Sequence, residues 1–281
     1  MNLCVLGSGT MGRGIVAFFA QMPFVGHVYW WGRQDGEIAN QIKILRQDLL
    51  RQCKRKSFTE EQTQMIIEKV TITHDVEDLS GGDFYIEAVA ENLEIKKKVL
   101  SSLNGVLPVD VIVASNTSSI SITELSMCLS RPEQFIGMHL FNPISVMKLV
   151  ELVVGLTTSN ETLEKAKKIV TDLEKSFVVV NDSPGFIVNR MLIPLINEAI
   201  AIYSEGVALK EDIDAAMKLG ANHPIGPIAL ADLIGTDVCL FIMETLHQET
   251  GDPKYRAHPL LRQYVRAGRL GRKVRRGFYE Y

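Results

Sequence analysis

A histidine and a glutamate twelve residues apart are the pair in this sequence best suited to proton transfer. His139 ends the apolar run Phe135–His139, within GMHLFNP at 137–143, and Glu151 interrupts a second apolar run, KLVELV at 148–153. A buried carboxylate needs a partner, because an unpaired buried charge costs much free energy. We expect an acid–base pair in which the imidazole exchanges the proton and the carboxylate fixes its tautomer. A core histidine beside a separately ion-paired glutamate would fit the same pattern about as well.

A glycine-rich segment near the start of the chain indicates a phosphate site. GSGTMG at 7–12 has the spacing G-x-G-x-x-G, directly after the apolar run Leu3–Leu6 and before a helical pattern. The first glycine permits a tight turn, the second lets the backbone approach a pyrophosphate, and the third allows close strand–helix packing. The motif is weak alone, but in this position it predicts a dinucleotide site. Its residues are Gly7, Gly9, Thr10, Met11 and Gly12.

The end of the second predicted strand bears on the choice between NAD and NADP. An NAD site usually has Asp or Glu there, which hydrogen-bonds the ribose 2′-OH. Here the strand His27–Trp31 is followed by Gly32 and Arg33. Glycine has no carboxylate to repel a 2′-phosphate, and a guanidinium can bind one through two N–H groups. We therefore expect NADP in preference to NAD; the alternative is that Arg33 points into solvent and Asp35 takes the acidic role.

A run of small polar residues, SNTSS at 115–119, follows the apolar run Val111–Ala114. Hydroxyl and amide groups at this point could hold a substrate carbonyl and the amide of a nicotinamide. The alternative is a cap for the helix that is expected to begin near Ser121. Both functions are compatible, because a cap needs only part of the cluster.

Short β-rich runs alternate with helical patterns through the first half of the chain. The expected strands are Leu3–Leu6, His27–Trp31, Val70–Thr73, Phe84–Val89, Val111–Ala114, Phe135–His139, Leu149–Val153 and Phe177–Val180. The expected helices are Met11–Gln21, Gly36–Lys56, Leu93–Leu103 and Asn160–Leu173. Several strands are apolar throughout, as in parallel strands that are buried on both faces. This alternation predicts an α/β fold with a doubly wound sheet of the Rossmann type.

The pattern changes to helical after residue 183. We therefore expect a dinucleotide-binding domain at 1–183 and an all-α domain at 184–281, with a helix kinked by Pro194. The stretch Ile228 to Met243 is apolar around most of its circumference, so it must be buried on several sides. A second copy would cover the apolar surface that a domain of this size leaves exposed, which predicts a homodimer through the C-terminal helices.

The balance of charge excludes one class of partner. The 281 residues include 30 Lys+Arg and 33 Asp+Glu, a formal charge of −3, whereas proteins that bind nucleic acid usually have a clear basic excess. The distribution is uneven, because residues 262–276 hold seven basic groups and no acid. We expect no nucleic acid as a partner, but local basic patches that suit small phosphorylated ligands.

Cysteine spacing and hydropathy bear on metals and location. The four cysteines lie far apart, without a CxxC pair, so we expect reduced thiols and no metal site. No signal-peptide pattern follows Met1, and the most apolar later stretch is interrupted by Asp232 and Asp237. These features predict a cytoplasmic protein that does not cross a membrane.

Taken together, these segments resemble the 3-hydroxyacyl-CoA dehydrogenase family, in particular its short-chain 3-hydroxybutyryl-CoA members. The resemblance spans essentially the whole chain and rests on GSGTMGRG (7–14), EAVAE (87–91), SNTSSI (115–120), GMHLFNP (137–143), PGFIVNR (184–190), LGANHPIGP (219–227) and residues 271–281. The glycine motif is generic, whereas the combination of the later motifs is highly specific. The sequence departs from the family at Leu140, where Phe is commoner, and in the missing ribose acid.

The resemblance implies a role for individual residues. His139 matches the family's catalytic base and Glu151 its orienting carboxylate. Ser118 matches the serine that contacts both substrate oxygen and cofactor, and Asn189 the asparagine near the substrate carbonyl. Without the family, Asn189 would be interpreted as an ordinary polar position near the start of a helix.

Further residues match binding positions of the family. Glu91, Lys96, Asn142 and Lys273 match cofactor contacts. For Lys96 the alternative is a solvated helix face. The basic run KRK at 54–56 ends a predicted helix, and in a family whose substrates have a CoA 3′-phosphate it becomes a candidate anchor. The lysines of this anchor are Lys54 and Lys56, and a solvated cluster is the alternative.

The activity implied by the resemblance is the interconversion of 3-hydroxyacyl-CoA and 3-oxoacyl-CoA, in fatty-acid and butyrate metabolism, with NADP or NAD. A dehydrogenase of free β-hydroxy acids on the same two-domain plan is an alternative, but it would typically use a catalytic lysine. A nucleotide-binding relative without activity is a second alternative. The presence of His139, Glu151, Ser118 and Asn189 argues against that loss of catalysis.

Overall fold

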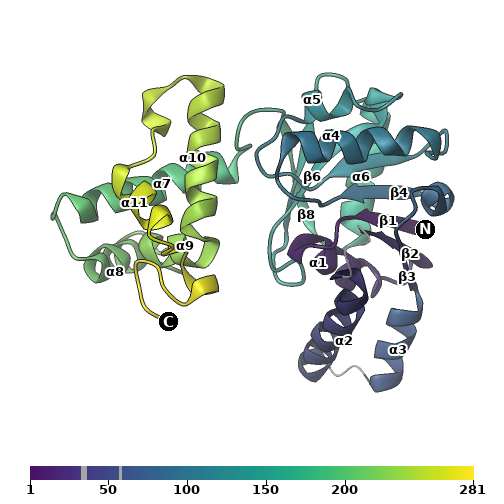
Figure 1. The fold of residues 1–281 in the computed structure, drawn as a ribbon, viewed down its shortest axis with the longest axis horizontal. Coiled ribbons are helices and arrows are strands. Elements are labelled where there is room, and N and C mark those ends of the chain that lie inside the picture. The colour runs from purple at the N-terminus through teal and green to yellow at the C-terminus, as the bar shows by residue number, and fades with distance from the viewer. Residues whose placement is uncertain (33–36, 57–58) are drawn as a thin grey trace. The chain divides into compact units, whose positions relative to one another are not determined.

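The computed structural model describes residues 1–32, 37–56 and 59–281, with only the backbone at 37–39 and 52–56. The chain forms two compact units, Met1–Asp182 and Ser183–Tyr281, which are described separately (Figure 1). Arg33 and Asp35 lie outside the described residues, and so do the side chains of Lys54 and Lys56.

In the described residues of the first unit, eight strands form one sheet in the order β3-β2-β1-β4-β5-β6-β7-β8. The strands are β1 (Asn2–Leu6), β2 (His27–Trp31), β3 (Val70–Thr73), β4 (Phe84–Glu87), β5 (Ile112–Ser115), β6 (Phe135–Leu140), β7 (Leu149–Val154) and β8 (Ser176–Asn181). The reversal of order on either side of β1 confirms the doubly wound α/β fold, in which ligands bind beyond the carboxyl ends of the strands.

One strand departs from the parallel sheet that the sequence predicts. β7 runs antiparallel to β6, whereas β8 is again parallel to β7. The reason is the length of the connection: only residues 141–148 separate β6 from β7. A parallel pair needs a crossover of a dozen residues or more, so these eight residues permit only an antiparallel return.

Six α-helices lie in the described part of the first unit. They are α1 (Thr10–Phe19), α2 (Glu37–Lys56), α3 (Glu60–Glu68), α4 (Leu93–Ser102), α5 (Ile122–Ser126) and α6 (Asn160–Asp172). α3 is not among the helices expected from the sequence, although its start has a recognisable signal. Thr59 and Gln62 form a capping box, in which each side chain accepts a hydrogen bond from the other residue's backbone N–H.

The second unit is helical in its described residues. Its α-helices are α7 (Val188–Ser204), α8 (Lys210–Gly220), α9 (Pro227–Ile234), α10 (Thr236–Thr250) and α11 (Pro259–Arg266). The stretch 228–243, treated in the sequence analysis as one helix, is in fact two, because Gly235 has a φ of +109° that ends α9. Pro194 lies inside α7, and the kink that it should cause stays a prediction.

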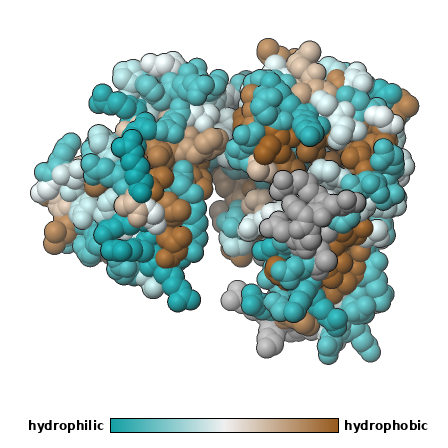
Figure 2. All heavy atoms as spheres, in the orientation of Figure 1, coloured by the Kyte–Doolittle hydropathy of each residue, from teal (hydrophilic) through white to brown (hydrophobic). Residues whose placement is uncertain are grey.

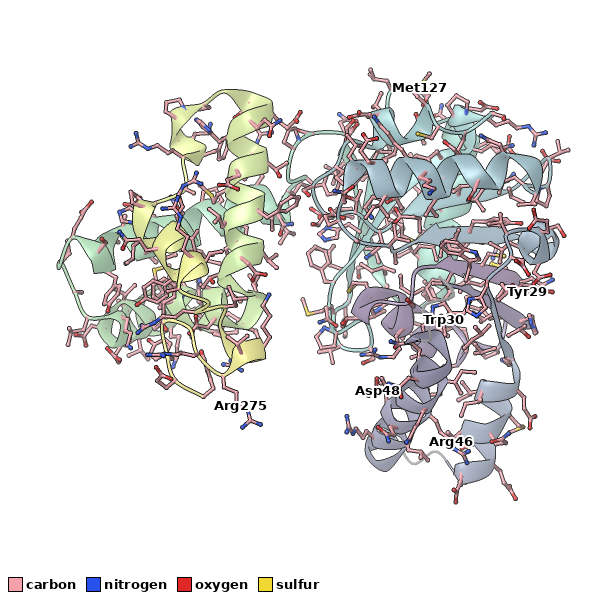
Figure 3. The ribbon with its side chains drawn as sticks, viewed as in Figure 1. Tyr29, Trp30, Arg46, Asp48, Met127 and Arg275 are labelled. Carbon is pink, nitrogen blue, oxygen red and sulfur yellow. The ribbon has the colours of Figure 1, made fainter. Side chains whose placement is uncertain are left out.

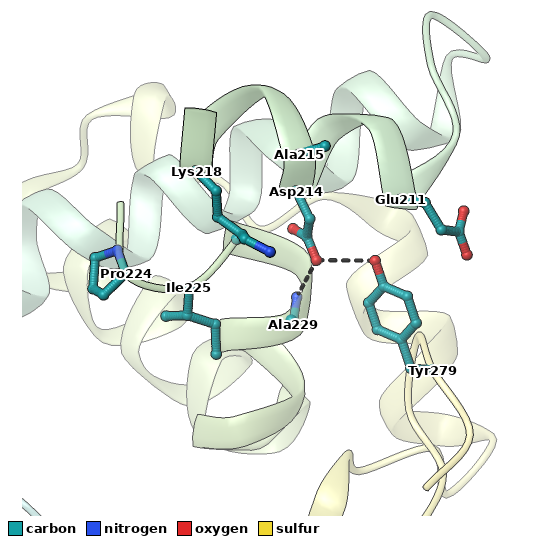
Figure 4. Close-up of a pocket in the computed structure, with 9 residues that line it drawn as sticks. Glu211, Asp214, Ala215, Lys218, Pro224, Ile225, Ala229 and Tyr279 are labelled. Carbon is teal, nitrogen blue, oxygen red and sulfur yellow. Dashed lines mark hydrogen bonds between the residues drawn. The ribbon is translucent and has the colours of Figure 1, made fainter. Parts of the chain in front are cut away.

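Two buried aspartates join the last residues of the chain to the helices of the second unit. Asp232 accepts hydrogen bonds from the backbone N–H groups of Phe278 (2.9 Å) and Tyr279 (2.8 Å). Asp214 accepts from two N–H groups at the start of α9, including that of Ala229, and from the Tyr279 hydroxyl (Figure 4).

A cavity of about 330 Å³ lies beside Asp214 and is lined by Lys218, Ile225 and Tyr279 among others. Burial and the neighbouring carboxylate raise the pKa of the Tyr279 phenol. The Asp214 carboxylate already accepts three hydrogen bonds from within the second unit. We therefore assign this cavity no role in the chemistry. In the described chain, no helix has both the length and the apolar character needed to cross a membrane.

Candidate active site

His139 and Glu151 face each other across two neighbouring strands. They are register partners in the antiparallel pair β6–β7, so their side chains are on the same face of the sheet. His139 Nδ1 lies 2.7 Å from Glu151 Oε2; Glu151 is fully buried, and His139 is 7% exposed. The Glu151 carboxylate accepts a hydrogen bond from the Nδ1–H of His139, which leaves the basic lone pair of the imidazole on Nε2. The short return between β6 and β7 is what brings the two residues together.

The loop that follows His139 is anchored at several points. The Phe141 ring packs on the imidazole, with ring centroids 4.3 Å apart. Lys175 Nζ donates hydrogen bonds to the carbonyl oxygens of Ile144 (2.6 Å) and Met147 (2.7 Å), and the Ile144 side chain is buried. Asn142, a predicted cofactor contact, is exposed in this anchored loop.

The glycine-rich turn has the steric properties that the motif predicts. A Cβ added to Gly7, whose φ is +129°, would lie 2.4 Å from the carbonyl oxygen of Ala88. One added to Gly12 would lie 1.9 Å from the carbonyl oxygen of Gly7, so neither position accepts a side chain. One added to Gly9 would meet no described atom within 4 Å, and Gly9 is the N-cap of α1. The open space therefore lies over the first N–H groups of the helix, where a pyrophosphate would bind.

A buried ion-pair network lies at the carboxyl end of β4. Lys96 Nζ is 2.7 Å from Glu87 Oε1 and 3.3 Å from Glu91 Oε2, and Lys96 is only 1% exposed. The alternative of a solvated helix face for Lys96 is therefore wrong. Its methylene chain and ammonium enter the interior of the first unit because two carboxylates offset the loss of hydration.

The Glu91 carboxylate joins this network to the SNTSS segment. It accepts hydrogen bonds from the Thr117 hydroxyl (2.6 Å), the Ser118 N–H (2.9 Å) and the Ser119 hydroxyl (3.0 Å). Burial acts to raise the pKa of Glu91, but Lys96 and these donors outweigh it, so that the pKa is lowered. Glu91 thus stays ionised and orients the segment that holds Ser118.

Other residues of the SNTSS segment connect the strands on either side. Ser115 donates a hydrogen bond of 2.6 Å to Glu87, and the Asn116 side chain accepts one of 2.9 Å from the backbone N–H of Leu140. Leu140 makes this contact through its backbone, so its departure from the family's Phe leaves the contact intact. The segment does not cap α5: Ser121 is the N-cap, supported by Asp182.

Glu87, Lys175 and Asp182 were not assigned in the sequence analysis. Glu87 had a signal, because it is an acid at the end of the apolar run FYIE, which is the same signal that identified Glu151. Lys175 and Asp182 had none. Their partners are 28 to 31 and 59 to 61 residues distant in the sequence, and only the folded chain brings them together.

Two of the predicted site residues belong to the second unit. Asn189 is the second residue of α7, and Lys273 Nζ lies 2.6 Å from Asp237 Oδ2. Their contacts with a ligand of the first unit stay predictions. In the part of the chain that the structure describes, no group of three or more His, Cys, Asp or Glu residues has the arrangement of a metal site.

Known families account for both units. The family model described as 3-hydroxyacyl-CoA dehydrogenase, NAD binding domain, matches residues 2–183, and that of the C-terminal domain of the same enzymes matches residues 185–281. The chain belongs to the 3-hydroxyacyl-CoA dehydrogenase family. This match confirms the resemblance that was inferred from the motifs. It also confirms that the first unit is of a nicotinamide-dinucleotide-binding type.

Individual relatives cover the whole chain. It is 49% identical to the 3-hydroxybutyryl-CoA dehydrogenase of Clostridioides difficile, over 100% of this chain and 99% of the relative. It is 46% identical to the probable 3-hydroxybutyryl-CoA dehydrogenase of Bacillus subtilis (strain 168), over 100% and 97%. The crystal structure of (S)-3-hydroxybutyryl-CoA dehydrogenase from Ralstonia eutropha superposes with a TM-score of 0.93, at 44% identity over 100% and 98% of the two chains. The fold class is thus confirmed over both units.

Proposed function

We propose that this family member interconverts 3-hydroxybutyryl-CoA and acetoacetyl-CoA. The observation that carries the proposal is the buried 2.7 Å pair of His139 and Glu151 at the carboxyl end of β6. The pair lies on the same sheet as β1, the strand that leads into the glycine-rich turn. The relatives of this chain are named for that activity. The first unit is proposed as the dinucleotide-binding domain and the second as the domain for substrate contacts and dimerisation, in a cytoplasmic enzyme.

The proton transfer is assigned to His139. In the oxidation direction, Nε2 takes the proton of the C3 hydroxyl while the hydride leaves C3, and a ketone remains. In the reduction direction, the imidazolium returns that proton to the oxygen at C3. Glu151 holds the ring in the Nδ1–H tautomer and stabilises the positive charge that the ring acquires. When bound, a nicotinamide dinucleotide supplies the hydride acceptor.

Stabilisation of the substrate oxygen is assigned to Ser118 and Asn189. A hydroxyl and an amide can donate hydrogen bonds to an oxygen whose negative charge grows in the transition state. The hydrogen bond from the Ser118 backbone N–H to Glu91 supports this role, because it fixes the backbone that carries the hydroxyl. Asn189 is proposed from the family motif PGFIVNR alone.

The cofactor is proposed to be NADP rather than NAD. Gly32 is buried and its carbonyl oxygen lies 2.7 Å from His74 Nδ1, so the end of β2 is fixed without any carboxylate at position 32. The proposed contacts of the dinucleotide are Gly7, Gly9, Thr10, Met11, Gly12, Arg33, Glu91, Lys96, Ser118, Asn142 and Lys273. Lys54 and Lys56 are proposed as the anchor of the CoA 3′-phosphate.

The proposed assembly is a homodimer through the C-terminal helices. Ile228, Cys239 and Ile242 are buried within the second unit, but Leu233 of α9 and Phe241 of α10 are 52% and 40% exposed. Figure 2 shows apolar side chains among hydrophilic ones on the drawn face of this unit. A second copy that covers this apolar surface would explain the exposure. Sedimentation at micromolar concentration is expected to give a dimer, and a monomer would contradict the proposal.

The activity is tested by following the absorbance of the reduced nicotinamide. Acetoacetyl-CoA is offered with NADPH and separately with NADH, and free acetoacetate with each serves as the control. We expect turnover of the CoA thioester, with the higher kcat/KM for NADPH. Turnover of free acetoacetate alone would indicate the free-acid dehydrogenase. No turnover with either substrate would indicate the nucleotide-binding relative, and a higher kcat/KM for NADH would remove the role given to Arg33.

A further inference from the structure

Two adjacent tryptophans in β2, the only two in the chain, make different contacts. Side chains alternate between the faces of a strand, so their indoles lie on opposite faces of the sheet. Trp30 is fully buried, and its Nε1–H donates a hydrogen bond of 2.8 Å to the carbonyl oxygen of Gly7. Trp31 is partly buried and donates one of 2.9 Å to the carbonyl oxygen of His74. Of these two indole N–H groups, that of Trp30 is therefore the one that donates to the glycine-rich turn (Trp30 is labelled in Figure 3).

Gly7 is held by β2 at both of its polar groups. Its N–H donates a hydrogen bond of 3.0 Å to the backbone carbonyl of Trp31, and its carbonyl oxygen accepts the one from the Trp30 indole. The same oxygen faces the start of α1, since a Cβ on Gly12 would lie 1.9 Å from it. The orientation of the Gly7 carbonyl thus determines how closely the turn packs on the first turn of the helix.

We propose that Trp30 is a positioning residue for the dinucleotide, one that orders the phosphate-binding turn before the ligand arrives. This inference rests on the dinucleotide site proposed above. An aliphatic side chain at this point of β2 would fill the core but could not donate a hydrogen bond. The Gly7 carbonyl would then be buried without this donor, and other orientations of the turn would become populated. Because only the competent orientation binds, the apparent dissociation constant rises as its population falls.

Trp30→Phe tests the inference, because it removes the donor and keeps an aromatic ring in the core. Tyr85→Phe is the matched control. Tyr85 is also fully buried and lies in β4, which pairs with β1. Its hydroxyl donates a hydrogen bond to the backbone carbonyl of Leu79, which lies outside the turn. Binding of NADPH and NADH is measured by the fluorescence of the reduced nicotinamide, excited directly. We expect Trp30→Phe to raise Kd and the cofactor KM roughly 5- to 50-fold. Tyr85→Phe should change them less than about twofold.

The kinetic constants separate positioning from general damage. At saturating cofactor we expect the kcat of Trp30→Phe to stay within about twofold of the unmodified protein, because an ordered turn affects binding rather than the reacting groups. Equal Kd values for Trp30→Phe and the unmodified protein would overturn the inference. An equal rise in Trp30→Phe and Tyr85→Phe would overturn it too, since the cause would then be lost stability.

A second variant removes the N–H alone, for the case in which Trp30→Phe does not fold. In a Trp31→Phe background, position 30 is the only tryptophan, so benzothienylalanine can replace it biosynthetically with a sulfur in place of the N–H. The same rise in Kd is expected relative to Trp31→Phe with tryptophan at position 30. An unchanged Kd would overturn the inference. If the unmodified protein bound neither NADPH nor NADH, the proposed dinucleotide site would fail as well, which distinguishes the two results.

Discussion

Two carboxylate sites in the same unit, one fully buried and the other with a side chain 29% exposed, differ in their partners. Glu151 has a partner that can change its charge, the imidazole of His139 at 2.7 Å. Glu91 has a permanent cation, Lys96, and three hydrogen-bond donors from residues 117–119. The first arrangement can take up and return a proton, whereas the second holds its charge and orients the serines. The identity of the partner therefore decides whether a carboxylate of this unit takes part in the proton-transfer chemistry.

The largest expected effect is on kcat, at the proton-transferring pair of His139 and Glu151. His139→Gln removes the general base but can still donate a hydrogen bond to Glu151. We expect kcat to fall about 10²- to 10⁴-fold while cofactor affinity hardly changes. Steady-state kinetics with acetoacetyl-CoA and a cofactor titration measure the two quantities. A variant with normal kcat would remove His139 from the mechanism.

The next effect is on the stability of the permanent ion pair. Lys96→Met leaves Glu87 fully buried without its cation and also removes the partner of the partly buried Glu91. Breaking a buried pair in this way destabilises a protein by about 3–5 kcal/mol. Chemical denaturation should show this loss. The adjacent Lys97 is the control, because its pairs with Glu94 and Glu124 are at the surface, so Lys97→Met should change stability little. Equal effects of the two substitutions would contradict the buried network.

The carboxylate of the proton-transfer pair has a smaller effect than the imidazole. Glu151→Gln keeps the shape of the side chain but removes the charge that stabilises the imidazolium. Hydrogen bonds to charged groups contribute about 1.5–3 kcal/mol, which corresponds to a fall in kcat of roughly 10- to 150-fold. Steady-state kinetics with acetoacetyl-CoA measure this fall. An unchanged kcat would mean that Glu151 does not act on His139.

The smallest effect concerns pH and Glu91. Its pKa is lowered below the ordinary value of 4.5 in the folded protein, so ionised Glu91 stabilises the fold above that pH. As the pH falls through the lowered pKa, this contribution is lost. Stability curves of the unmodified protein and Glu91→Gln should therefore differ by a constant amount at neutral pH and converge below about pH 4.5. A difference that grows on acidification would reverse the assigned direction.

Local patterns predicted the elements well where the signal was local. The bounds of β2 and β3 match the expected ranges, because each is a short run rich in β-branched or aromatic residues that ends at a change of composition. The split of 228–243 was missed, since it depends on the positive φ of Gly235, a backbone state that hydropathy does not record. The sequence revealed the basic groups of 262–276, such as the exposed Arg275 labelled in Figure 3. It did not reveal what these groups contact.

The sequence by itself determined the types and spacing of the chemical groups: the three glycines of the turn, the histidine at the end of a strand, and the acid inside an apolar run. These are local properties, governed by the conformation and hydration of neighbouring residues. Only the tertiary structure decided the pairing. It made β7 antiparallel, which places Glu151 opposite His139, and it buried Lys96 between Glu87 and Glu91. It also directed the Trp30 indole to Gly7, because contacts between distant segments depend on how the whole sheet is assembled.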